Sequence, residues 1–152
     1  EISRIWKLGQ KYPYPLHLVK MSKNSKRVIE QLNDGYKMAL VTSRVKVGVR
    51  NFYKISKMRK YFDVCVSYED TENHKPHPEP LLFAAKKLRV KPVNCVYIGD
   101  AETDVRAGKA AGMKVILYSK NKVKGADFVA SSFSEIPKVI EKLNITDHKK
   151  SG

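Results

Sequence analysis

The segment "YIGDAETDVRAGKAAGM" (residues 97–113) places two acidic residues where an apolar strand gives way to a helix. Asp100 follows Gly99 at the end of the predicted strand, and Asp104 lies on the first turn of the predicted helix. Acidic side chains in this position can simply stabilise the helix dipole, by about 0.3–1 kcal/mol each. Two carboxylates that converge beside a glycine are also typical of one half of a binding site. The other half is expected at the ends of neighbouring strands.

Apolar strands alternate with amphipathic helices on both sides of this segment. The sequence predicts strands over residues 37–42, 62–67, 95–100, 114–119 and 127–130. It predicts helices over 26–33, 45–60, 78–88, 102–111 and 134–143, with Ser25 and Ser134 capping the first and last. Because the strands are apolar on both faces, we expect an α/β fold with a Rossmann-like parallel sheet flanked by helices. Ligands in such folds bind at the carboxyl ends of the strands.

Length and composition are those of one globular domain. The chain has 152 residues, enough for a hydrophobic core, and no run of 18 apolar residues that would cross a membrane. The two cysteines, Cys65 and Cys95, each lie in an apolar run, and we interpret them as buried free thiols of a cytoplasmic protein. The chain starts at Glu1 and not at Met, which favours a portion of a longer protein.

The net charge of +15 is unevenly distributed along the chain. Residues 1–60 hold 15 Lys and Arg against 3 Asp and Glu, a net +12, which leaves +3 for residues 61–152. Such an excess can attract phosphate groups, but scattered lysines more often form a solvated surface. The basic residues show no aromatic interleaving, so we disfavour the alternative of a nucleic-acid-binding module.

Three strand ends carry side chains suited to a phosphate ester. Thr42–Ser43 end the strand over 37–42, Lys75 precedes the helix over 78–88, and Asp100 and Asp104 follow the strand over 95–100. A hydroxyl can donate to a phosphoryl oxygen, and an ammonium group can neutralise its charge. Two carboxylates suit Mg²⁺, which binds one or two of them together with water and phosphate. The sequence therefore predicts a magnesium and phosphate site at these strand ends.

Each of these groups also has a structural interpretation. Thr42–Ser43 can cap the helix that follows, and a lone lysine is usually solvated. The spacing His74-x-x-His77 invites a zinc site, which we disfavour because no third ligand stands near. Glu69 and Asp70 end the strand over 62–67 and face either the site or solvent.

Three motifs taken together resemble the haloacid dehalogenase superfamily of hydrolases. They are "ALVTSR" (39–44), "KPHPEP" (75–80) and "YIGDAETD" (97–104), which occur in the order of that family's second, third and fourth motifs. The resemblance extends over about residues 25–143 and is to the subgroup with a small helical cap, which includes phosphoglycolate phosphatases and pyrophosphatases. It implies an aspartyl-phosphate mechanism that uses Mg²⁺ and a small phosphorylated substrate.

The resemblance also implies roles for individual residues. Thr42, Ser43 and Lys75 would bind the phosphoryl group, with Thr42 and Lys75 counted as catalytic. Asp100 would ligate the metal. Asp104 would ligate or orient it and is counted as catalytic as well.

The family's first motif, an Asp-x-Asp that supplies the nucleophile and the acid-base group, is absent from this chain. The acids before Thr42 are Glu1, Glu30 and Asp34. In the family, the strand with that motif runs between the strands that end here at Thr42 and Asp100. We therefore expect a core that lacks the first central strand. Either another segment fills the gap, with Leu16–Met21 as the candidate inside this chain, or the sheet rearranges.

These inferences define the expected organisation and function. Residues 1–24 are unassigned, with the end of a cap or a linker as an interpretation; residues 25–145 form the core portion, and 146–152 a polar tail. The expected function is the C-terminal core portion of a magnesium-dependent phosphatase acting on a small phosphate ester, inactive as the isolated chain. The alternatives are a degenerate relative that binds a phosphorylated ligand or a protein, and the nucleic-acid-binding module.

Overall fold

The computed structural model describes residues 21–121 and 123–143. Five helices are found in this part of the chain: α2 (Ser25–Asn33), α3 (Lys46–Ser56), α4 (Glu79–Leu88), α5 (Glu102–Ala110) and α6 (Ile136–Lys142). The strands of the same part are β1 (Ala39–Val41), β2 (Val64–Val66), β3 (Val96–Gly99), β4 (Lys114–Tyr118) and β5 (Phe128–Ala130). The polar tail and the candidate strand over residues 16–21, except Met21, lie outside the described residues.

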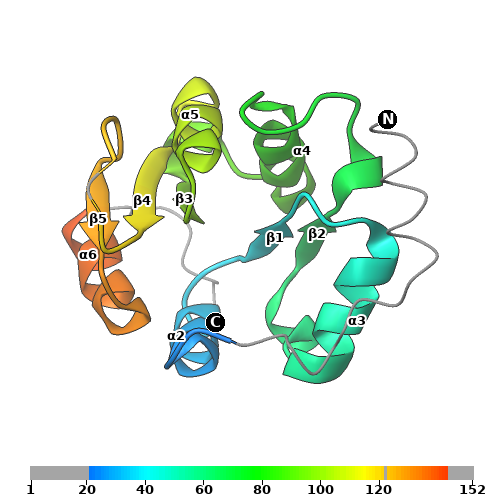
Figure 1. Ribbon diagram of the computed structural model, residues 1–152, viewed down its shortest axis with the longest axis horizontal. Coiled ribbons are helices and arrows are strands. Elements are labelled where there is room, and N and C mark those ends of the chain that lie inside the picture. Colours follow the sequence, from blue (N-terminus) through cyan, green and yellow to red (C-terminus); the bar gives the residue numbers. More distant parts are fainter. Residues whose placement is uncertain (1–20, 122, 144–152) are drawn as a thin grey trace.

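All pairings between these strands are parallel, which confirms the predicted α/β class. The strands form two separate sheets, one of β1 and β2 and one in the order β3-β4-β5 (Figure 1). Helices cover both faces of these sheets. Within each sheet the carboxyl ends of the strands lie at one edge, and the predicted site residues follow β1 and β3.

Alternate residues of each strand face opposite helical layers. In β3, Tyr97 packs in a cluster with Leu81 of α4 and Ala107 of α5. Its neighbours Val96 and Ile98 pack instead against a cluster that includes residues of α2 and α6. This alternation explains why the strand is apolar throughout, since both of its faces are covered.

Two helices, α2 and α4, connect the sheets. Val28 of α2 belongs to the cluster below β3–β5, whereas Ile29 of the same helix packs against the core formed by Met58, Tyr61 and Phe62 beside β1. On the opposite face, Leu81 of α4 is packed against residues of both β1 and β3. The two sheets are therefore held in a fixed relation from above and below.

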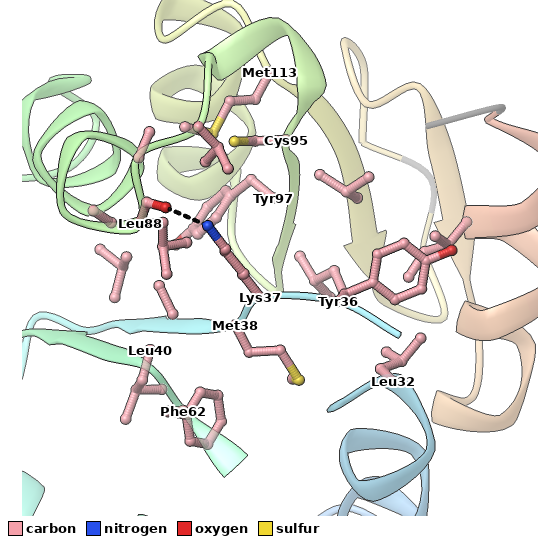
Figure 2. Close-up of a pocket in the computed structure, with 18 of the residues that line it drawn as sticks. Leu32, Tyr36, Lys37, Met38, Leu40, Phe62, Leu88, Cys95, Tyr97 and Met113 are labelled. Atoms are coloured by element: carbon pink, nitrogen blue, oxygen red, sulfur yellow. Dashed lines mark hydrogen bonds between the residues drawn. The ribbon is translucent and has the colours of Figure 1, made fainter. Parts of the chain in front are cut away.

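A cavity of about 350 Å³ lies between the two sheets (Figure 2). It is lined by Met38–Val41 on one side and Cys95–Ile98 on the other, and Lys37 Nζ donates a hydrogen bond to the carbonyl of Leu88 at 3.2 Å. In the described part of the chain, β1 pairs with β2 alone and β3 with β4 alone. Among the described residues, β1 and β3 each therefore have one edge without a strand partner.

Three local predictions were wrong. The helix expected over 45–60 ends at Ser56, because Lys57 adopts a left-handed conformation with φ of 57° and a 3₁₀ turn follows over Arg59–Tyr61. Ser25 is not a cap; it is the first residue of α2 and is buried, and Asn24 occupies the N-cap position. Ser134 lies within a 3₁₀ turn, Phe133–Glu135, before α6 begins.

The cysteines and the membrane prediction can be compared with the structure directly. Cys65 and Cys95 are free, as expected, but half-buried and not fully buried. Burial raises the pKa of both thiols. No helix formed by the described residues combines the length and apolar character that crossing a bilayer requires.

We predict that α4 is the main support of the fold across the cavity. Leu81 is 1% exposed, so Leu81→Ala should lower the free energy of unfolding by about 2–5 kcal/mol, measured by urea denaturation. Leu82 is 40% exposed on the same helix, so Leu82→Ala is the matched control and should change stability by less than about 0.5 kcal/mol. Equal effects of the two substitutions would contradict this role of α4.

Candidate functional site

A buried ion pair joins two of the predicted site residues. Lys75 Nζ lies 2.7 Å from Asp104 Oδ1, and the two side chains are only 13% and 6% exposed. Lys75 comes from the loop between β2 and α4, and Asp104 from the first turn of α5. The pair therefore connects the loop before α4 to the start of α5, although the two residues are 29 positions apart in the sequence.

The Asp104 carboxylate accepts four hydrogen bonds. Oδ1 accepts from Lys75 Nζ and, at 2.9 Å, from the hydroxyl of Tyr97. Oδ2 accepts from the backbone N–H groups of Asp100 at 3.0 Å and Ala101 at 3.1 Å. Asp104 therefore caps the start of α5 and also holds the loop that carries Asp100, so the structural and the site interpretations of this acid both apply.

The charge of Asp104 is stabilised by its neighbours. Burial by itself would raise the pKa of its carboxyl group, and the hydrogen bond and charge of Lys75 are the largest of the effects that oppose it. The Tyr97 hydroxyl and the Asp100 N–H act in the same direction, and the net pKa is lowered. Burial raises the pKa of Tyr97, and the adjacent Asp104 charge raises it further, so this phenol stays protonated.

Gly99 allows the strand end to approach Asp104. A Cβ atom on Gly99 would lie 2.3 Å from Asp104 Cβ and 2.7 Å from its Oδ2, far inside van der Waals contact. Only a residue without a side chain therefore fits between β3 and the first turn of α5.

The carboxylate of Asp100 is available for a metal ion, unlike that of Asp104. Asp100 is exposed at the end of β3, whereas both Asp104 oxygens already accept hydrogen bonds. The described residues include no group of three His, Cys, Asp or Glu side chains placed to hold a metal. The site therefore fits Mg²⁺ in part, with one free carboxylate and a second that orients the loop.

Thr42 and Ser43 directly follow β1, which ends at Val41. Thr42 Oγ1 accepts a hydrogen bond from the N–H of Arg44, and Thr42 N–H donates to the carbonyl of Val66. The N-cap residue of α3 is Val45, so Thr42 does not cap that helix. Hydrogen bonds thus join Lys75, Asp100 and Asp104, but Thr42 and Ser43 stand apart from this cluster.

The other polar residues near the strand ends have structural partners. Both carboxylate oxygens of Glu69 accept from the N–H of Lys46 at the start of α3, and Asp70 pairs with the Lys46 side chain at 3.0 Å. The ring of His74 stacks on Tyr68 at 3.7 Å between centroids, and His77 Nδ1 accepts from the N–H of Glu79. These contacts give no support to a zinc site at the two histidines.

Tyr97 belongs to the cluster but was not among the predicted site residues. Its hydroxyl lies 3.1 Å from Lys75 Nζ and 2.9 Å from Asp104 Oδ1. Two signals in the sequence could have indicated it. It lies two residues before Gly99 and so on the same strand face, and a tyrosine in an apolar strand needs a partner for its hydroxyl.

Fold and site together define an α/β protein of the Rossmann-like class, with charged side chains gathered at the carboxyl ends of parallel strands. The family model of haloacid dehalogenase-like hydrolases matches residues 3–118, and the chain belongs to that family. This match confirms the resemblance that the three sequence motifs indicated.

Individual relatives agree with this result. Pyrophosphatase PpaX of Bacillus mycoides is 34% identical over 125 residues, which cover 77% of this chain and 58% of the relative. The crystal structure of a haloacid dehalogenase-type phosphatase from Thermococcus onnurineus matches with a TM-score of 0.76 and 28% identity, over 88% of this chain and 63% of that one.

A hydrolase of the superfamily from Geobacter sulfurreducens shares the fold, with a TM-score of 0.78 at 21% identity over 91% of this chain and 65% of that one. The chain thus spans less than two thirds of the length of each of these proteins.

The contact between Gly99 and Asp104 can be tested by adding one methyl group. Gly99→Ala should displace Asp104 and lower the free energy of unfolding by about 1–3 kcal/mol, because the new atom has no space. Gly35 has no atom within 4 Å of an added Cβ, so Gly35→Ala is the control. It should be neutral or stabilising by up to about 1 kcal/mol in the same denaturation experiment. A stable Gly99→Ala variant would contradict the close approach.

Stability should depend on pH through Asp104. Because folding lowers its pKa, ionised Asp104 stabilises the fold above its unfolded-state pKa of about 3.9, and this contribution is lost as pH falls through the folded-state value. Asp104→Asn should therefore cost about 3–5 kcal/mol at pH 7, where it leaves Lys75 without its carboxylate, and progressively less as the pH falls below about 3.9 toward the folded-state pKa.

Thermal denaturation across this pH range measures the difference between wild type and variant. Asp34 is exposed, so Asp34→Asn is the control and should cost less than about 0.5 kcal/mol. A cost of Asp104→Asn that is the same at pH 3 and pH 7 would contradict the role given to its charge.

Proposed function

We propose that this chain forms the core portion of a phosphatase that hydrolyses a small phosphate ester or pyrophosphate and depends on Mg²⁺. The observation that carries the proposal is the buried ammonium group of Lys75, held at the strand ends by Asp104 beside the exposed Asp100. Its relatives support the substrate class, since one is described as a pyrophosphatase and another as a phosphatase.

Each residue of the site has a chemical role in this proposal. Lys75 would neutralise a phosphoryl oxygen, and the hydroxyl groups of Thr42 and Ser43 would donate to the same group from the opposite side of the cavity. Asp104 keeps Lys75 charged and in place. Binding at this edge needs no movement of the strands, because Lys75 and Asp104 are already fixed by packing and hydrogen bonds.

Asp100 is the residue that would hold Mg²⁺, and Asp104 would orient it through the N–H of Asp100. Bound Mg²⁺ would neutralise charge on the phosphoryl oxygens. The described residues supply only part of a magnesium shell, so the isolated chain is expected to bind the ion weakly.

The proposal places the nucleophile outside the described residues. Covalent phosphoryl transfer of this kind needs a carboxylate in line with the leaving group, and both Asp104 oxygens are engaged. We place an additional strand in the cavity of about 350 Å³ between β1 and β3, where its backbone could pair with both open edges. A carboxylate at the end of such a strand would lie between Thr42 and Lys75.

One alternative keeps the fold without catalysis. The incomplete set of metal ligands among the described residues favours a module that binds a phosphorylated ligand through Lys75 and Thr42 but does not hydrolyse it. Turnover distinguishes this module from the phosphatase.

Activity should appear when the unmatched part of a relative is supplied. A chimera that joins the unmatched portion of Bacillus mycoides PpaX to this chain should hydrolyse an aryl phosphate with Mg²⁺, and the chain alone should not. In the chimera, Lys75→Ala should lower turnover by about 10²–10³-fold, because it removes one preorganised charge. Lys86 is exposed on α4, and Lys86→Ala is the control that should leave turnover unchanged.

Two results would contradict this account. Magnesium-dependent turnover by the chain alone, abolished by Asp100→Asn, would place a nucleophile within the described or adjoining residues of this chain. A folded chimera that binds phosphate without turnover would favour the binding module.

A further inference from the structure

The ring of Tyr97 is fixed by packing before any ligand binds. It lies on the face of β3 toward α4 and α5, among a cluster that contains Leu81 and Ala107. A Cβ atom added to Gly108 would lie 3.3 Å from Tyr97 Cδ1, so the ring rests closely on the backbone of α5. The same ring lines the cavity between the sheets (Figure 2). The position of its hydroxyl group is therefore set by the core.

The hydroxyl of Tyr97 completes a triangle with Lys75 and Asp104. The three sides are 3.1 Å from Oη to Nζ, 2.9 Å from Oη to Oδ1 and 2.7 Å from Nζ to Oδ1. An ammonium group can only donate and a carboxylate can only accept, so the directions of these bonds are determined. The phenol accepts from Lys75 and donates to Asp104.

This arrangement leaves one ammonium hydrogen of Lys75 for a ligand. An ammonium group has three N–H donors, and two of them are used by Tyr97 and Asp104. The third has no hydrogen-bond partner among the residues that the structure describes. Two anchors fix the direction of that third N–H, whereas a single anchor would let the ammonium group swing about the Asp104 oxygen.

The geometry points to Tyr97 as a positioning residue, which acts through Lys75 and aims its remaining N–H group at the phosphoryl oxygen. The identity of the ligand, a phosphoryl group, rests on the proposed function. The arrangement of Tyr97, Lys75 and Asp104 does not depend on it. Tyr97 touches neither the proposed substrate nor the metal. Its contribution is to hold a long, flexible lysine side chain in one place before the ligand arrives.

Competitive labelling of lysine amines tests this role without any substrate. The chain is labelled at one pH with a trace of an amine reagent, and the rate at each lysine is read by mass spectrometry. Tyr97→Phe keeps the ring and removes only the oxygen, so Lys75 should be labelled about 2–10-fold faster, as expected for the loss of one hydrogen bond. Lys109, paired with Asp127 at 2.9 Å, should be unchanged.

Tyr118, near the end of β4, provides the matched control. Its ring packs against Phe133 in a tilted arrangement, with 4.7 Å between the ring centroids, and Tyr118→Phe should leave the rate at Lys75 unchanged. In the unmodified chain, Lys75 should react more slowly than the exposed Lys86. This comparison uses no variant, so it does not depend on whether a variant folds.

Three results would overturn the inference. They are an unchanged Lys75 rate in folded Tyr97→Phe, an equal rise at Lys75 and Lys109, and equal rates at Lys75 and Lys86 in the unmodified chain. An equal rise would mean that the hydroxyl only supports the fold in general. Because no turnover is measured, failure of the phosphatase proposal would not alter any of these outcomes.

Discussion

The Asp104 carboxylate is the group on which the arrangement of this site depends. It accepts hydrogen bonds from a lysine, a tyrosine and two backbone amides, and it is almost fully buried. A buried charge without partners is strongly destabilising, so each donor must stay within hydrogen-bond distance of the carboxylate. The loop after β3, the start of α5 and the loop before α4 are therefore fixed relative to one another by one side chain.

A second constraint comes from the open strand edges. β1 and β3 each have one edge without a strand partner in the described part of the chain, yet the two sheets remain in a fixed relation. Apolar contacts from α2 on one face and α4 on the other provide that support. Side-chain packing across both faces thus supports the two sheets on either side of the cavity, although β1 and β3 are not paired with each other in the described part of the chain. Both helices were visible in the sequence, because their apolar residues recur at helical spacing.

The sequence indicated most of the elements because apolar runs and glycines mark the strand ends clearly. It could not locate the end of α3, because Met58 continues the helical spacing of buried residues even though Lys57 has already left the helix. Lys75 and Asp104 were predicted from motifs at strand ends. Tyr97 was missed because its role arises from the packing of β3 under α5, which brings together residues 97, 75 and 104. A pattern along the chain does not contain that contact.

The cavity and the charged cluster are coupled through Tyr97, whose ring faces the cavity and whose hydroxyl binds the cluster. A strand placed between β1 and β3 would cover that ring and exclude water from the space beside it. Charges interact more strongly where water is excluded, so the same strand would strengthen the attraction between Lys75 and Asp104. Tyr97 lies on β3, which has one edge without a strand partner in the described part of the chain, and its hydroxyl binds the ammonium group of Lys75. The same added strand would therefore complete both the sheet and the site.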